Sequence, residues 1–307
     1  MLTPVKKKYF LFYFLFAFSI AATAQEESTA EDIPSGPVQK GFQFGLYMGA
    51  LFPNKYTASL HDGYGIDFDG KRNSFENSYM YHKIVLQYGG GYPGEPDLIA
   101  QELNVQHTDW HFDESDMPAF MRYQPAILLG LQTRYSVDGK NIILLNINAA
   151  QLTANGSFTI TTIPQYIPGQ NAQTIREFKI KGMEQRLMFQ LGLQHLFGKS
   201  EQINFLLEGG VNVTMTKLGK NLIQINNLTI DLTSYYYVQG FPAYSVVRRT
   251  GVGLGAFTGM GVNFNASEKA VIQLVYNPTY EGINVGARSE TRLKLQHSVG
   301  LRAYYKL

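Results

Sequence analysis

A glycine-rich stretch offers the first chemistry that this sequence could carry out. Residues Thr250 to Phe264 read TGVGLGAFTGMGVNF, and the first part has the G-x-G-x-x-A form of a relaxed dinucleotide-binding motif. Such a motif needs a helix after the glycines, so that the helix N-terminus meets the pyrophosphate. Here Gly259 and Gly261 follow, and each glycine costs a helix about 1 kcal/mol relative to alanine. The glycines fall only on odd positions, which predicts a strand with one apolar face and one bare face.

A second group could bind a metal ion. The stretch HTDWHFDESD alternates chemistry-bearing residues, so a strand would place on one side the side chains of His107, Asp109, His111 and Asp113. Histidine and carboxylate ligands suit zinc and other transition metals. The alternative is a hydrated acidic loop, because residues 53–119 hold 4 basic and 11 acidic residues. Asp67-Phe68-Asp69-Gly70 hints at calcium but lacks most of the twelve-residue calcium-loop pattern.

A hydrolase active site would need a nucleophile and a base within hydrogen-bond reach. His297 and Ser298 are neighbours on an alternating segment, so they point to opposite faces. His195 falls on the apolar face of its own segment. We therefore expect no catalytic residue and no cofactor.

Charged residues on the polar faces of the alternating segments predict an internal ion pair. Glu208 is the one acid at the mid-segment inward positions, against Arg134, Arg186 and Arg302. An unpaired buried charge is costly, so this carboxylate needs a partner. Glu208 and Arg302 should lie at similar height, with Arg134 lower, and we expect Glu208 to meet Arg302 or Arg134. If the alternating segments close into a barrel, such a pair would block its interior, which argues against a diffusion porin.

Eight segments of period-2 alternation must position these residues, near 42–52, 126–135, 143–149, 187–195, 205–213, 252–264, 272–276 and 297–307. Short turns alternate with longer loops, which we place at 53–119, 153–182, 217–250 and 281–290. An even number of strands with alternating short and long connections is the form of an all-β, transmembrane, antiparallel up-and-down β-barrel. Within the second loop, 156–163 and 174–181 also alternate. They predict a hairpin that extends two strands above the membrane, or a further spanning pair that would make ten strands.

The N-terminal residues have the form of a secretory signal peptide. Lys6, Lys7 and Lys8 precede an apolar run, and Ala22-Thr23-Ala24 is a small-residue cleavage site. We expect a signal peptide at 1–24, a disordered periplasmic leader at 25–40 and a barrel at 41–307. Without the signal lysines, 23 of the 26 basic residues remain against 24 acidic ones, so nucleic acid is not an expected partner. The sequence has no cysteine, which excludes a lipid-anchored lipoprotein and any disulfide.

The terminal stretch HSVGLRAYYKL resembles the last strand of Gram-negative outer-membrane barrels, although it ends in Leu307 and has its aromatic residue at Tyr305. With the signal peptide and the turn alternation, residues 41–307 resemble the small OmpA- and OmpX-type barrels. This resemblance implies the cell outer membrane, with both termini in the periplasm and no peptidoglycan-binding domain after the last strand. It implies outer-membrane lipid and lipopolysaccharide as partners, and another outer-membrane protein as a further candidate. The expected function is non-enzymatic display of surface loops; a lipid A-modifying enzyme, a narrow channel and a subunit of a larger complex are the alternatives.

Overall fold

A computed structural model describes residues 40–66, 71–163, 174–198, 200, 202–234, 250–285 and 293–307. The predicted signal peptide at 1–24 and the calcium hint at 67–70 lie outside these residues, as does the predicted leader at 25–40 except for Lys40.

Eight long antiparallel strands close into a barrel, which confirms the predicted fold class. In ladder order they are β1 (Gly41–Phe52), β4 (Ala126–Ser136), β5 (Asn141–Thr162), β6 (Thr174–Phe197), β7 (Ile203–Ile225), β9 (Thr250–Asn265), β10 (Ala270–Val285) and β11 (Lys294–Lys306). β11 pairs with β1, so the sheet has no open edge at that seam. The ten-strand alternative is wrong, because 156–162 and 174–181 pair with each other as continuations of β5 and β6.

Side-chain alternation gives this barrel an apolar outer face and a mixed, buried interior. Large apolar side chains are exposed on every long strand, among them Met48, Leu131, Leu145, Leu191, Val211, Leu254, Leu274 and Leu301. The glycines of residues 251–261 lie on the inward face of β9, so this stretch is a strand rather than a nucleotide-binding loop. No helix in the described part of the chain is long and apolar enough to cross a membrane.

The short connections gather at one end of the barrel. Gly41 pairs with Ser136 beside the first short turn, and Gln43 pairs with Lys306 near the end of the chain. The first strand therefore begins, and the last strand ends, at the end of the barrel that carries the short turns. The longer connections leave from the opposite end, which we call the loop side.

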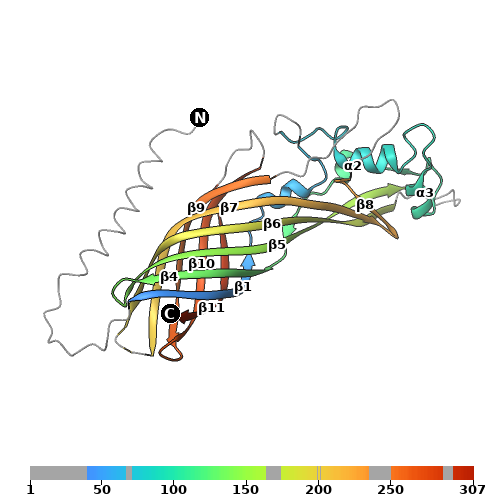
Figure 1. Cartoon of the computed structure of the whole chain (residues 1–307). Coiled ribbons are helices and arrows are strands. Elements are labelled where there is room, and N and C mark those ends of the chain that lie inside the picture. The colour runs from blue at the N-terminus through green and yellow to red at the C-terminus, as the bar shows by residue number, and fades with distance from the viewer. Residues whose placement is uncertain are drawn as a thin grey trace, which may run out of the picture. The chain divides into compact units, whose positions relative to one another are not determined.

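The barrel wall is much taller along three strands than elsewhere (Figure 1). β5, β6 and β7 have 22, 24 and 23 residues, whereas β1, β4 and β11 have 12, 11 and 13. β7 continues to Ile225, turns at Asn226 and returns as β8 (Leu228–Asp231). The loop predicted at 217–250 therefore starts too early, and so does the one predicted at 281–290, because β10 runs to Val285.

The connection from β1 to β4 is folded, so the expectation of a hydrated acidic loop is wrong. It contains the 3-10 helix η1 (Thr57–His61), α2 (Tyr79–Tyr81) continuing as the π-helix η2 (His82–Gln87), and α3 (Leu98–Leu103). After α3 come β2 (Trp110–His111), the 3-10 helix η3 (Glu114–Asp116) and β3 (Arg122–Tyr123), and both short strands pair with β5. The side chain of Asp97 caps α3 by accepting a hydrogen bond from the Ala100 backbone N–H, and Asn104 ends α3 in the left-handed conformation.

A hydrophobic core joins this connection to the tall wall. Met80, Ile84 and Ile99 are fully buried against inward-facing side chains of the wall, which include Phe158, Phe178, Ile180, Ile223 and Ile225. Burying one isoleucine, leucine or methionine side chain stabilises a fold by about 1.5–3 kcal/mol. The connection and the wall therefore fold together, and we call this unit, residues 53–66 and 71–125 with the ends of β5, β6 and β7 and with β8, the loop-side platform.

Candidate functional site

The interior of the barrel holds six buried charged side chains in the part of the chain that the structure describes. They balance three carboxylates against three guanidinium groups and come from five strands: Arg134, Glu184, Arg186, Glu208, Glu281 and Arg302. Each has the inward parity of its strand, because successive side chains of a strand point to opposite faces. They form two groups at different heights, and we call these the lower and the upper ion cluster.

The lower ion cluster is built on Glu208. Arg302 donates from Nη1 to Glu208 Oε2 at 2.6 Å and from Nη2 to Glu208 Oε1 at 2.7 Å, a bidentate pair. Gln194 donates to Oε2 at 2.9 Å and Asn277 to Oε1 at 3.2 Å, so each carboxylate oxygen accepts two hydrogen bonds. Satisfied lone pairs are what a buried ion pair requires to offset the cost of desolvation.

Arg134 reaches this carboxylate only through a third residue. Its Nη1 donates to Gln194 Oε1 at 3.2 Å, and Gln194 in turn donates to Glu208. The Nε of Arg134 donates to Gln43 Oε1 at 2.7 Å, and the guanidinium carbon lies 4.0 Å from the centre of the Tyr304 ring. Of the two partners expected for Glu208, the structure therefore places Arg302 in direct contact and Arg134 one side chain away.

The glycines of β9 make room for the buried carboxylates. A Cβ atom on Gly259 would lie 2.6 Å from Glu208 Cγ, and one on Gly255 would lie 2.6 Å from Glu281 Cβ. Both distances are well below ordinary van der Waals contact. The bare face of β9 thus serves close packing of acidic side chains on β7 and β10.

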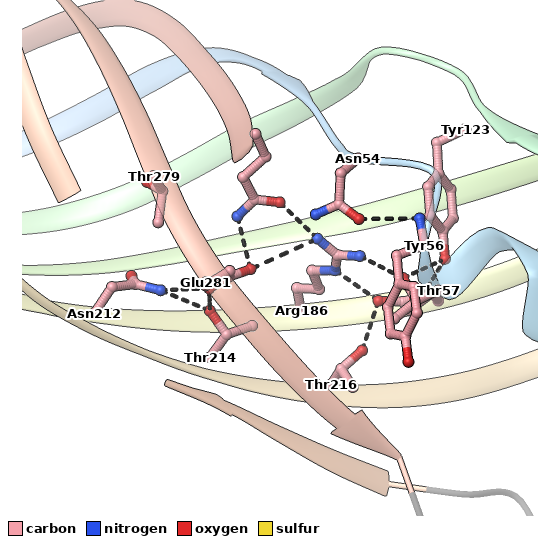
Figure 2. A network of polar contacts seen from close by, with 12 residues as sticks. Asn54, Tyr56, Thr57, Tyr123, Arg186, Asn212, Thr214, Thr216, Thr279 and Glu281 are labelled. Atoms are coloured by element: carbon pink, nitrogen blue, oxygen red, sulfur yellow. Dashed lines mark hydrogen bonds and ion pairs between the residues drawn. The ribbon is translucent and has the colours of Figure 1, made fainter. Parts of the chain in front are cut away.

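The upper ion cluster is built on Arg186. Its Nε donates to Glu184 Oε1 at 2.6 Å, its Nη1 to Gln296 at 2.8 Å and its Nη2 to Thr57 Oγ1 at 2.8 Å. Glu281 Oε1 lies 3.9 Å from Nη1. Figure 2 shows Arg186 between Glu281 on one side and Thr57 with Tyr123 on the other.

Glu281 and Glu184 each accept several further hydrogen bonds. Glu281 Oε2 accepts from Asn212 at 2.5 Å and from Thr214 at 2.6 Å, and its Oε1 accepts from Gln296 at 2.8 Å. Glu184 accepts from Thr216 at 2.7 Å and from the Tyr123 hydroxyl. Neither carboxylate is left with the open coordination that a general acid or base would use.

The sequence analysis missed Glu184 and Glu281, because it ended their strands at 187 and 276. The alternation of inward and outward positions along each strand would have identified both residues if the strands had been extended. Glu184 has the same parity as Arg186, and Glu281 has the same parity as Asn277, so extending either strand turns the acid inward.

The first connection closes the barrel above the upper ion cluster. Thr57 lies on η1 and Tyr123 on β3, and their hydroxyl oxygens are 3.0 Å apart. Thr57 also receives the Arg186 hydrogen bond described above, so both ends of the connection are tied into the lumen (Figure 2). The platform is therefore anchored to the barrel interior by polar contacts as well as by its hydrophobic core.

A very small cavity lies among residues that contact the two ion clusters. This cavity of about 10 Å³ is lined by residues from both levels, including Arg302 and Asn277 below and Gln296 above. A polar cavity of roughly 10–15 Å³ on this measure holds about one water molecule. Side chains therefore fill the lumen at this height, as expected for a barrel of eight strands.

The residues that could have bound a metal are not brought together. The strand that would have aligned them is only two residues long, and His107 Nδ1 instead lies 2.6 Å from Asp97 Oδ2. Asp97 Oδ2 also accepts a hydrogen bond from the Trp110 indole. His111 Nε2 lies 3.5 Å from Asp113 Oδ2, and Asp113 is the residue before η3, where its backbone N–H donates to Asp116 Oδ2 at 2.9 Å. Within the described ranges no three histidine, aspartate or glutamate side chains are grouped so that they could hold a metal ion.

The residues considered for a hydrolase are also separated. His297 faces outward, where its Nδ1 lies 2.6 Å from the Tyr276 hydroxyl, while Ser298 is buried inside and donates to the Asn277 backbone oxygen. His195 lies on the outer face too, 2.7 Å from Asn141 Oδ1. These histidines and the serine form no catalytic pair.

One buried histidine of the platform, His61, has a lowered pKa. His61 ends η1 and packs against Gly182 of β6, so closely that a Cβ on Gly182 would overlap the ring. Burial lowers the pKa of His61 below its ordinary value, and the charge of Glu184 opposes this only in part. The uncharged form of His61 is therefore favoured near neutral pH.

No family model matches the sequence, and no curated protein shows significant similarity to it. Among solved structures, Neisserial surface protein A (NspA) is similar over 87% of this chain and 96% of its own, with 8% identity and a TM-score of 0.35. The outer membrane protein OprG from Pseudomonas aeruginosa is similar over 88% of this chain and 97% of its own, with 12% identity and a TM-score of 0.39. At these values the likeness adds nothing to the strand pairings, on which the fold assignment rests.

Proposed function

We propose that this protein is a non-conducting barrel of the Gram-negative outer membrane that presents its loop-side platform at the cell surface for binding. The observation that carries the proposal is the filled lumen beneath a folded platform. Two ion clusters occupy the interior, and the cavity lined by residues of both levels has room for about one water molecule. The folded surface available to a partner is then the platform.

The outer face supports the placement in a membrane. Exposed leucine, isoleucine, valine, methionine and phenylalanine side chains surround the barrel, as they do in barrels that contact lipid. In water such an apolar surface would promote aggregation. The signal-peptide pattern agrees with export, and the short turns and both ends of the barrel chain then lie in the periplasm.

A lipid A-modifying enzyme remains the second candidate, and the geometry argues against it. The outward histidines contact Tyr276 and Asn141, while the interior carboxylates are saturated with hydrogen bonds. Mass spectrometry of lipid A from a deletion strain would reveal a change if this alternative held.

Cysteine labelling tests the orientation in intact cells. Asn227→Cys, at the exposed tip of the β7–β8 turn, should react with a membrane-impermeant maleimide. Lys140→Cys and Glu268→Cys, exposed in short turns at the other end, should react only after the cells are opened. Labelling of the short turns with protection of Asn227→Cys would reverse the proposed orientation.

A liposome-swelling assay tests the closed lumen. Vesicles with the refolded protein should take up small sugars no faster than vesicles without protein. Rapid uptake would show an open pathway and would favour the narrow channel.

A further inference from the structure

The outward face of the loop-side platform carries a groove that takes no part in filling the lumen. Its volume is about 740 Å³, which is within the range of binding sites for small ligands. The groove lies across β3, β5, β6, β7 and β8, and the side chains that matter here are Phe120, Arg122, Asn155, Lys179, Lys181 and Gln224.

The strand register places these side chains in two rows on one face. Arg122 pairs with Asn155, and Asn155 pairs with Lys181. The next row runs from Ser157 through Lys179 to Gln224. Adjacent strands are about 4.8 Å apart, so Arg122 and Lys181 lie roughly 10 Å from each other across the groove. One saccharide headgroup can span that distance.

The groove has an excess of positive charge. Arg122, Lys179 and Lys181 line it, against Glu177 as the only acidic lining residue. All three cationic side chains are exposed, and none forms an ion pair with another residue in the described ranges. Their donors are therefore available to an anion, in contrast to the arginines of the lumen.

The groove stands just beyond the lipid-facing part of the same strands. The continuous row of exposed apolar side chains on β6 and β7 ends at Leu187 and Met215, which pair with each other. Beyond it on β6, only Ile175 at the start of the strand is a large exposed apolar residue. Lys181 is six residues farther along β6, about 20 Å along the strand. Lys217 and Lys220 on β7 continue the basic surface between the apolar band and the groove. With strands tilted by about 35–45°, the groove stands roughly 15 Å above the apolar band, a height that the sugars of an outer-leaflet glycolipid reach and its acyl chains do not.

We propose that the groove binds the phosphorylated saccharide headgroup of an outer-leaflet glycolipid. Arg122 can hold a phosphate with two parallel hydrogen bonds, and Lys179 and Lys181 add point charges. Asn155 offers hydrogen bonds to sugar hydroxyls. The ring of Phe120, which is 73% exposed, offers an apolar face to a sugar ring. The proposal rests on the outer-membrane placement proposed above and names one partner of the platform.

The test uses the full barrel in phosphatidylcholine nanodiscs and measures its binding of lipopolysaccharide that carries lipid A and phosphorylated inner-core sugars. Arg122→Glu/Lys179→Glu/Lys181→Glu should bind at least about tenfold more weakly than the unmodified protein, because charge-assisted hydrogen bonds are lost and repulsion is introduced. The matched control is Lys40→Glu/Lys140→Glu/Lys269→Glu, which makes the same charge change at exposed positions on the short-turn end and should bind normally. Phe120→Ala should weaken binding several-fold (roughly threefold to tenfold) with no change in charge.

Two further arms separate the glycolipid from simpler anions. The same lipopolysaccharide after enzymatic dephosphorylation should bind about as weakly as the triple platform variant does. Inorganic phosphate at millimolar concentration should not displace the intact glycolipid. Equal binding by the two triple variants, full binding of the dephosphorylated glycolipid, or displacement by inorganic phosphate would each overturn the proposal. Circular dichroism is the check that both triple variants are folded. None of these outcomes bears on whether the lumen is closed.

Discussion

Glu208 on β7 and Arg302 on β11 form a bidentate ion pair across the lumen, with N–O distances of 2.6 and 2.7 Å. The two strands are not neighbours, because β9 and β10 lie between them in the sheet. The pair therefore joins distant parts of the barrel wall through its interior. With Gln194 and Asn277 it fills the lumen below the upper ion cluster.

Removing one partner of this pair should destabilise the barrel strongly. Glu208→Gln leaves Arg302 buried without its counter-charge, and breaking a buried pair costs about 3–5 kcal/mol. Arg302→Gln should cost a similar amount, and the double variant should cost clearly less than the sum. Urea unfolding in lipid vesicles would measure the three free energies of unfolding, and strictly additive losses would show that the two side chains do not interact.

A methyl group on the inner face of β9 should disturb the same pair. Gly259→Ala places a Cβ within 2.6 Å of Glu208 Cγ, so the carboxylate must move. Gly209→Ala is the matched control on the outer face, where the added Cβ would have no neighbour closer than 3.5 Å. We expect a loss of about 1–3 kcal/mol for Gly259→Ala, typical of overpacking, and little change for Gly209→Ala. Equal free energies of unfolding would mean that Gly259 is not needed for space.

Period-2 alternation was enough to predict the barrel and the inward position of its glycines. The same parity puts Glu208 and Arg302 on inward faces, where the structure brings them into contact. Parity failed where the strands leave the lipid, because outward residues such as Lys181 and Lys217 are then polar and the apolar signal disappears. This is why the sequence analysis ended β6 and β10 too early and missed Glu184 and Glu281 of the upper ion cluster.

Depth in the membrane should decide the cost of a charge on the outer face. Leu191 and Gln185 share the outward face of β6, but Leu191 lies in the apolar band and Gln185 lies beyond its loop-side end. Leu191→Arg should cost about 2–4 kcal/mol and Gln185→Arg about 0–1 kcal/mol. Refolding into vesicles followed by urea titration gives both values. Similar losses at the two sites would contradict the placement of the lipid-facing band.

The platform should loosen in acid because of His61. Burial lowers the pKa of this histidine in the folded state, whereas the unfolded value is about 6.5. The unfolded state therefore binds more protons at low pH, so the stabilising effect is complete above about pH 6.5 and is lost as the pH falls below it. Hydrogen exchange at the amides of η1 should speed up between about pH 7 and pH 5 more than exchange chemistry alone predicts.

His61→Gln provides the control for this effect, because glutamine does not titrate in the same range. The variant should show no extra opening of η1 in acid, although it is less stable at every pH. An acid response that persists unchanged in His61→Gln would assign the effect to another group.

The fold of the first connection was the part least accessible from the sequence. Its eleven acidic residues predict a solvated loop, yet Met80 and Ile84 are fully buried against the wall. The opposing residues, such as Phe158 and Ile223, belong to strands far away in the sequence. A short helix packed on a distant sheet leaves only a few apolar positions in its own stretch, too few for a periodic signal.

Single-channel recording in planar lipid bilayers tests the central claim most directly. The account predicts that the purified protein inserts without producing conductance steps, because the two ion clusters and the buried side chains around them fill the lumen. The cavity lined by residues of both levels has room for about one water molecule. Insertion is checked independently by protection of the barrel from protease. Stable conductance steps from inserted, folded protein would contradict the account, since ions would then pass the level of Glu208 and Arg302.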